Sequence, residues 1–179
     1  MNRQLFRSLS PLEATELLET FLHAGRSNSG NMATAARAEG VLADYSASSV
    51  PGVLKWLLSM VRTVGRTEDK ALPDWIRSSQ PYRSDLFDFD DPSRDLALQG
   101  SFYLGESFVR SFERLSWGTG EPGLIQENMP VVKGFKDGDE MPALLVVNNL
   151  FRRVLVDPGR LSDIEGAVEY WSSRARPAR

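Results

Sequence analysis

Carboxylates are the most abundant side chains in this sequence that could carry out catalysis. The chain has 24 aspartates and glutamates but one histidine and no cysteine, so proton transfer would have to rely on paired carboxyl groups. Two arrangements could supply such a pair: Glu106 with Glu127, or the aspartates between Asp85 and Asp91. Either pair would suit a small hydrolase or lyase, and this is the alternative hypothesis for the function.

The aspartate cluster in "DLFDFDD" also has the oxygen ligands that calcium and magnesium prefer. Its spacing, however, lacks the glycine and the distal glutamate of an EF-hand loop. Acidic residues are also favoured just before a helix and in its first turn, and Pro92 indicates such a start here. The sequence therefore predicts no metal site in this segment.

The other polar residues form no catalytic or cofactor-binding pattern. His23 falls on the polar side of the first predicted helix with Glu16 and Glu19, and we expect it to be exposed. A single histidine excludes a two-histidine metal motif, and the absence of cysteine excludes thiolate catalysis. GxxxxGK[ST] does not occur, and the GxGxxG match "GTGEPG" at 118–123 lacks the following helix that would supply amide donors to a phosphate. We therefore expect no cofactor and assign no catalytic residue.

The pair Gly105–Glu106 lies in the most motif-like stretch, "FYLGESFVRSFERLSWG". On a helical wheel Gly105 falls in an apolar arc, where a missing side chain allows a neighbouring element to approach closely. Glu106 falls outside that arc, four residues before Arg110, which is the favourable order for an ion pair. The spacing predicts a solvated surface pair. The alternative, in which the following β-hairpin covers Glu106 and makes it a buried acid, stays open.

The elements that would position these groups are mostly helices. A capping box formed by Ser10 and Glu13 starts the first helix, and "GRSNSGN" at 25–31 is predicted to be a loop. Residues 142–155 could form a strand, although Pro142 at the first turn favours a helix. The apolar spacing predicts helices at 10–22, 32–45, 50–64, 93–115, 142–155 and 159–174, and short strands at 116–118, 123–126 and 129–135.

These elements predict a single α+β domain over residues 1–175. It is mostly helical, with a small antiparallel β-meander between the central "YLGE" helix and the C-terminal helices. Residues 65–92 are expected to be a long irregular connection, and residues 174–179 a frayed basic tail.

Charge and hydropathy limit the partners and the location. The net charge of -3 gives no electrostatic reason to expect a nucleic-acid partner. No apolar run reaches the roughly 18 residues of a membrane-spanning helix, and the N-terminus has no signal-peptide pattern. We therefore expect a cytoplasmic protein that does not bind membranes or nucleic acids.

Aromatic and acidic residues in the 65–92 connection suggest recognition of another protein. Aromatic anchors among charged residues are typical of interfaces, and loops on a rigid scaffold commonly carry recognition. We expect both Asp85 and Asp88 to be exposed, and an acidic patch favours a basic partner. The candidate partner-binding residues are Trp75, Tyr82, Asp85, Phe87, Asp88 and Phe89.

From about Leu98 to Leu155 the order of parts resembles small uncharacterised bacterial domains. The shared features are a helix with "YLGE", a tryptophan at its exit, a short β-segment with "ENMPVV" and a proline-started helix ending in "LFRRVL". Some such domains are immunity proteins of polymorphic toxin systems. The resemblance implies no catalytic residues.

Together these observations predict a non-enzymatic protein-binding domain, of the immunity or regulatory type, from a bacterium. The sequence leaves open the identity of the partner, the pathway and whether the chain forms a homodimer.

Overall fold

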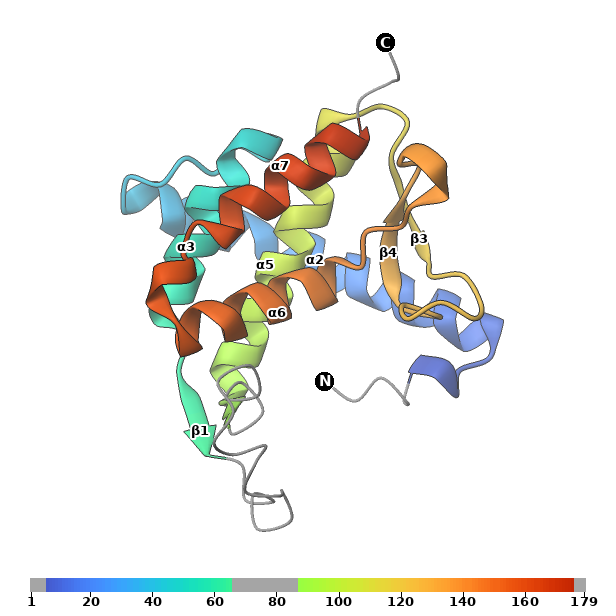
Figure 1. The fold of residues 1–179 in the computed structure, drawn as a ribbon, viewed down its shortest axis with the longest axis horizontal. Helices are drawn as coiled ribbons and strands as arrows, with labels where there is room; N and C mark the ends of the chain where they lie inside the picture. The colour runs from blue at the N-terminus through green and yellow to red at the C-terminus, as the bar shows by residue number, and fades with distance from the viewer. Residues whose placement is uncertain (1–5, 66–86, 176–179) are drawn as a thin grey trace.

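The computed structural model describes residues 6–65 and 87–175 of the chain. This part contains five α-helices and two two-stranded antiparallel sheets, which confirms a mostly helical α+β fold (Figure 1). The helices are α2 (Pro11–Ala38), α3 (Val50–Met60), α5 (Asp91–Ser111), α6 (Ala143–Val156) and α7 (Asp163–Ala175). The strands are β1 (Thr63–Gly65), β2 (Phe87–Phe89), β3 (Ser116–Thr119) and β4 (Pro130–Lys133), and short 3₁₀ turns are η1 (Ala47–Ser49), η4 (Lys136–Gly138) and η5 (Pro158–Arg160).

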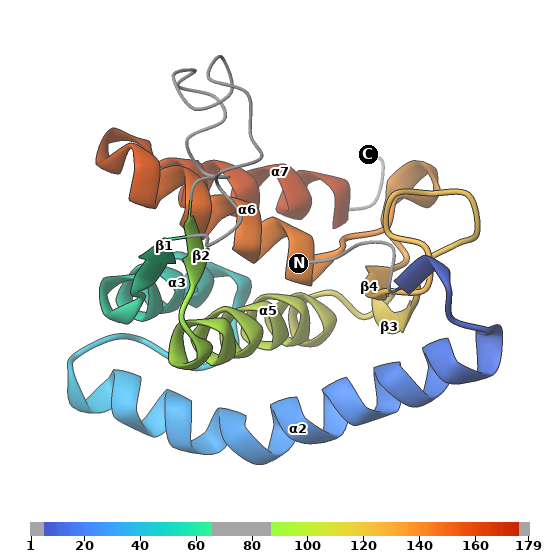
Figure 2. The same cartoon turned by 90° about the horizontal axis from the view of Figure 1, so that it is seen from below.

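The helices form three layers around α5. Figure 2 shows α2 on one side of the α3–α5 layer, with α6 and α7 on the other side. Every residue from Gly100 to Phe108 is buried, because α5 contacts helices on several sides. Gly100 lies against Leu54, Leu57 and Val147, so the absence of a side chain there lets α3 and α6 pack close to α5.

The first two predicted helices are a single helix, α2, and the predicted loop at 25–31 is wrong. The Ser10–Glu13 capping box starts α2 as expected: the Glu13 N–H donates to Ser10 Oγ over 3.3 Å and the Ser10 N–H donates to Glu13 Oε2 over 2.7 Å. Tertiary packing outweighs the low helix propensity of the glycines and serines in the middle, because Gly25 lies directly against the ring of Phe102. Gly40, with φ +79°, follows the end of the helix at Ala38.

The third predicted helix is shorter than expected. It ends at Met60, and Thr63–Gly65 pair with Phe87–Phe89 as the ribbon β1–β2, with Val64 opposite Asp88. The predicted irregular connection at 65–92 is therefore ordered at both ends: Gly65 closes β1, and Pro92 lies in the first turn of α5. The β-branched run at 61–64 is better suited to a strand than to a helix end.

The second sheet lies between α5 and α6, where the sequence predicts a meander. It is a two-stranded hairpin, β3–β4, extended by a single bridge from Val132 to Met141. The predicted strand at 123–126 is wrong, because this segment forms successive turns that include Gly123 at φ +83° and Asn128 at φ +61°.

The last two helices, α6 and α7, test the predictions for residues 142–155 and for the C-terminal tail. Residues 143–156 form α6, so the helix favoured by Pro142 is confirmed over the strand. Helix α7 continues to Ala175, which is buried, and Arg174 pairs with Asp137 and Asp139, so the predicted frayed tail does not begin at 174. Residues 176–179 lie outside the described residues.

Candidate functional site

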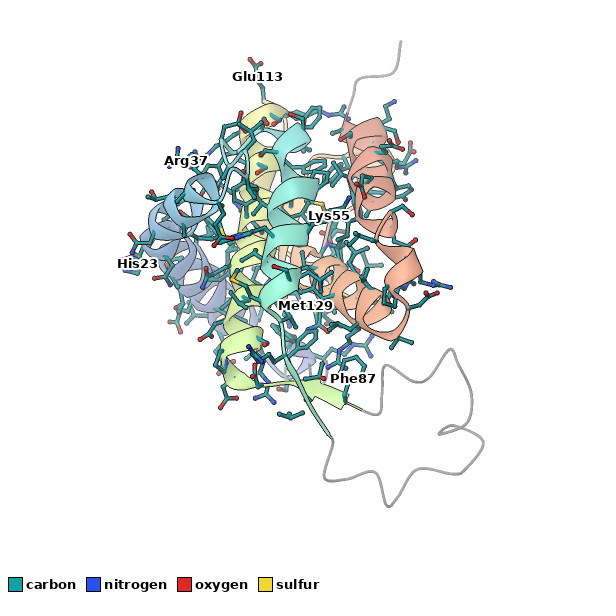
Figure 3. The ribbon with its side chains drawn as sticks, turned by 90° about the vertical axis from the view of Figure 1, so that its left-hand side faces the viewer. His23, Arg37, Lys55, Phe87, Glu113 and Met129 are labelled. Atoms are coloured by element: carbon teal, nitrogen blue, oxygen red, sulfur yellow. The ribbon has the colours of Figure 1, made fainter. Side chains whose placement is uncertain are left out.

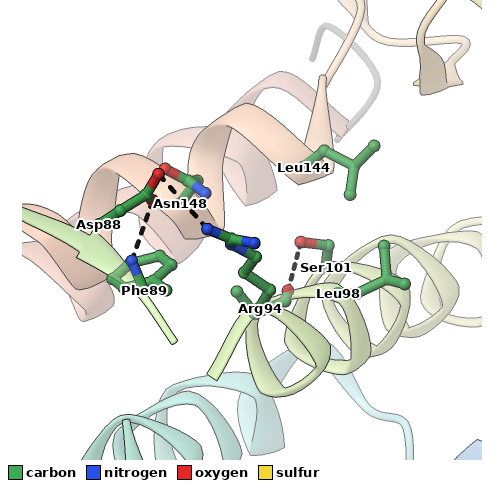
Figure 4. Close-up of a pocket in the computed structure, with 8 residues that line it drawn as sticks. Asp88, Phe89, Arg94, Leu98, Ser101, Leu144 and Asn148 are labelled. Atoms are coloured by element: carbon green, nitrogen blue, oxygen red, sulfur yellow. Dashed lines mark hydrogen bonds and ion pairs between the residues drawn. The ribbon is translucent and has the colours of Figure 1, made fainter. Parts of the chain in front are cut away.

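A pocket of about 330 Å³ opens between α5 and α6 beside β2 (Figure 4). Most of its wall is apolar, and Asp88 and Asn148 lie together at the end nearest β2. Its volume falls within the range of small-ligand sites, which is about 300–1,000 Å³. The described residues that line it are Asp88, Phe89, Arg94, Ala97, Leu98, Ser101, Leu144 and Asn148.

Arg152 of α6 holds the residues at the polar end of this pocket in place by hydrogen bonds. Its Nη1 donates to the carbonyl of Phe87 over 2.9 Å, its Nη2 to Asp88 Oδ1 over 2.8 Å, and its Nε to Asn148 Oδ1 over 2.9 Å. Its guanidinium also lies 4.9 Å from the ring centre of Phe89 and 5.5 Å from that of Phe87. One buried arginine thus holds strand β2 against helix α6.

Asp88 is the charged partner of this arginine and stays ionised. Burial by itself would raise the pKa of the Asp88 carboxyl, but the N–H of Phe89 and the charges of Arg152 and Arg94 together lower it below the ordinary value of 3.8. The Phe89 N–H donates to Asp88 Oδ1 over 2.9 Å, while Arg94 Nη2 lies 3.6 Å from Oδ2. Asp88 therefore keeps a negative charge at the polar end of the pocket.

The structure describes three of the six residues predicted to bind a partner. Phe87 is half-buried beneath Arg152, whereas Phe89 is 1% exposed and belongs to the core. The side chain of Asp88 is 31% exposed and ion-paired, so the prediction that it is freely exposed is wrong. Asp88 is partly buried because it pairs with Arg152 of α6, and the sequence did not predict that α6 packs against this segment. Trp75, Tyr82 and Asp85 lie outside the described residues.

Glu106 is buried, which corrects the predicted solvated pair. It is 8% exposed and accepts hydrogen bonds from Arg110 Nε (2.8 Å) and Trp117 Nε1 (3.2 Å). The predicted pairing with Arg110 is confirmed, but the wheel failed because β3 returns over this side of α5. A side chain on Gly105 would overlap the Trp117 ring, so the predicted close approach at this glycine is confirmed.

Three carboxylates of the enzyme hypothesis, Glu106, Asp90 and Asp91, make structural contacts. Neither Glu106 nor Glu127 lines the pocket. Asp90 caps α5 by accepting from the Ser93 N–H over 2.9 Å, and Asp91 pairs with Arg94 over 2.8 Å. Asp90 is thus the N-cap and Asp91 lies in the first turn, so the helix-start interpretation is confirmed for both acids.

Three further observations concern residues 6–65 and 87–175 only. No group of three or more histidine, cysteine, aspartate or glutamate side chains there is placed to hold a metal ion. His23 is exposed as predicted, on the outer face of α2 in Figure 3. Among the helices of these two stretches, none is long and apolar enough to span a membrane.

Sequence reasoning missed the two α6 residues that organise the pocket. Arg152 and Asn148 are one helical turn apart, and a helical wheel of residues 142–155 places both on the polar side, where a solvated position is expected. The available signal was their i,i+4 spacing, which lets an asparagine and an arginine pair along a helix. Arg152 is in fact 9% exposed, whereas its neighbour Arg153 is exposed.

Comparison with known proteins adds no family. No protein-family model, curated protein or solved structure matches this chain.

Proposed function

We propose that this chain is a non-enzymatic protein-binding domain, of the immunity or regulatory type. The observation that carries the proposal is the position of the Phe87–Phe89 strand. Arg152 holds this aromatic and acidic segment at the edge of a preformed pocket on a helical framework. Rigid presentation of a recognition segment lowers the conformational entropy that is lost on binding.

The charge pattern next to the pocket supports a basic partner. Asp91 and Asp95 are exposed on the first turns of α5, and Asp88 lies at the end of the pocket. Surface charges of one sign speed the encounter with a partner of the opposite sign, most strongly at low salt. The reversal of Asp88 to lysine would break the pair with Arg152, so Asp91→Lys with Asp95→Lys is the cleaner charge reversal.

The experiment is capture followed by reconstitution. The tagged full-length chain is used to isolate bound proteins from the cells that produce it, and each candidate is then purified separately and mixed with the chain. The proposal expects a complex of fixed stoichiometry by light scattering, and slower association for the Asp91→Lys/Asp95→Lys variant at low salt. Failure of every candidate to re-form a complex from purified components would contradict protein binding.

A further inference from the structure

At the polar end of the pocket Asn148 carries a donor that its own contacts leave uncommitted. A guanidinium can only donate hydrogen bonds, so the bond from Arg152 Nε identifies the accepting atom of Asn148 as Oδ1 and fixes the orientation of the amide. The other atom is therefore the Nδ2 donor group. It donates to no group in the part of the chain that the structure describes, and Asn148 lines the pocket.

Asp88 provides an acceptor beside that donor. Its Oδ1 is used by Arg152 and by the Phe89 N–H, whereas its Oδ2 has Arg94 at 3.6 Å, beyond hydrogen-bond range. Arg94 is itself held by Asp91 over 2.8 Å. The same guanidinium holds both Asp88 and Asn148, so Asp88 Oδ2 and Asn148 Nδ2, which form no hydrogen bond with the described residues, keep a fixed relation. Figure 4 shows the two side chains next to each other.

The remaining wall favours a compact apolar group. Phe89 and Ala97 are buried at its base, while Leu98 is 41% exposed and Leu144 is half-buried opposite it. Ser101 adds no donor, because its hydroxyl already donates to the carbonyl of Ala97 over 2.7 Å. The described residues that line the pocket are thus apolar apart from a donor and an acceptor at one end, with Arg94 at the side.

We infer that this pocket binds one residue of a partner's peptide chain: a main-chain amide at the polar end and a branched aliphatic side chain against the apolar wall. An amide carries both an acceptor for Asn148 Nδ2 and a donor for Asp88 Oδ2. A carboxylate would bring a second negative charge to Asp88, and an ammonium would leave the Asn148 donor without an acceptor. That the amide belongs to a partner protein rests on the proposed function.

The test is an NMR titration of the full-length, ¹⁵N-labelled chain with four probes that share an isobutyl group. They are N-acetyl-leucine N-methylamide, 4-methylpentanamide, 4-methylpentanoate and 3-methylbutan-1-amine. The expected result is saturable shifts of the Asn148 side-chain amide and of the backbone amides of Leu98 and Ser101. We expect the peptide mimic to bind most tightly, and the acid and the amine to bind at least about tenfold more weakly.

Other rankings overturn the inference in distinct ways. Equal binding of the primary amide and the peptide mimic would overturn the peptide source. Tighter binding of the acid would assign the pocket to Arg94 and an anion, and tighter binding of the amine would assign it to Asp88 and a cation. Shifts that do not saturate would overturn the site itself.

A matched pair of variants isolates the donor. Asn148→Asp keeps an acceptor for Arg152 but removes the Nδ2 donor, and Asn149→Asp makes the same charge change on the next, exposed residue. The expected result is about tenfold weaker binding of the mimic for Asn148→Asp and less than about twofold change for Asn149→Asp. Equal binding by both variants would overturn the role of Asn148.

A second variant guards against misfolding of the first. Leu98→Ala shortens an exposed wall residue and should weaken the mimic by about threefold or more with an unchanged amide spectrum elsewhere. Unchanged affinity would contradict the apolar half of the site. Since these titrations need no partner, their failure alongside an intact reconstituted complex would overturn this inference alone and leave the proposed function standing.

Discussion

Gly105→Ala should destabilise the protein, although the same change stabilises most helices. A Cβ at residue 105 would lie less than 3.0 Å from Cη2 and Cζ2 of Trp117, closer than real Cβ atoms come to other atoms. The ring would have to move by about 1 Å. Trp117 is held by its hydrogen bond to Glu106 (3.2 Å) and by its stacking on Phe102, with ring centres 6.3 Å apart and planes 8° apart.

The magnitude follows from opposing contributions. Overpacking costs about 1–3 kcal/mol, and weakening the hydrogen bond to the Glu106 carboxylate costs about 1.5 kcal/mol more. The higher helix propensity of alanine than of glycine stabilises the folded protein by about 1 kcal/mol. We therefore expect the free energy of unfolding to fall by about 1.5–3.5 kcal/mol.

Urea titration followed by circular dichroism at 222 nm measures this change, and α7 supplies the matched control. Gly166 is an exposed helical residue with open space where a Cβ would lie, so Gly166→Ala should raise the free energy of unfolding by about 0.5–1 kcal/mol. A double variant with Trp117→Leu should recover part of the Gly105→Ala loss, because the clash is with the large ring. If Gly105→Ala were stabilising to the same extent as Gly166→Ala, the packing argument would be refuted.

Three further changes test the buried charges by urea titration. Glu106→Gln should lower the free energy of unfolding by about 1–3 kcal/mol, because the amide of glutamine would place a donor against the donors of Arg110 or Trp117. Glu113→Gln, at an exposed position, should change it by no more than about 0.5 kcal/mol. Equal effects of the two changes would contradict the buried, hydrogen-bonded position of Glu106. Arg152→Lys should lower the free energy of unfolding by about 2 kcal/mol, because an ammonium cannot reach Phe87, Asp88 and Asn148 together. The same change at the adjacent, exposed Arg153 should be nearly neutral. A neutral Arg152→Lys would contradict the role given to the guanidinium. The pKa of Asp88 is lowered in the folded protein, so its contribution is full above its ordinary pKa of 3.8 and is lost as the pH falls through the lower folded value. The stability difference between wild type and Asp88→Asn should therefore shrink below about pH 4, and a constant difference from pH 7 to the acid limit would contradict the ion pair.

Local signals in the sequence account for much of the fold. The capping box at Ser10 and Glu13 and the proline before α6 depend on neighbouring residues only, and the structure confirms both. The continuous helix through residues 25–31 depends instead on Gly25 meeting Phe102, a contact between residues 77 positions apart in the chain. The propensity of that segment alone predicts a loop.

The organisation of the pocket was not predictable for the same reason. A helical wheel assumes one buried face and one solvated face, but α5 is enclosed over Gly100–Phe108 and α6 turns Arg152 toward β2. Whether an arginine is exposed or buried depends on which distant segment returns to cover it. The sequence indicated that Phe87, Asp88 and Phe89 belong together, and the structure shows the residue that joins them to α6.

The central claim is that the partner binds at this pocket. Isothermal titration of the reconstituted partner against three forms of the chain tests it most directly: wild type, Leu98→Glu and Leu161→Glu. Leu98 lines the pocket and is 41% exposed, while Leu161 is 40% exposed and is not one of the residues that line it. We predict that Leu98→Glu raises Kd at least about tenfold and that Leu161→Glu changes it by less than about twofold. Equal affinities for the two variants would contradict the claim.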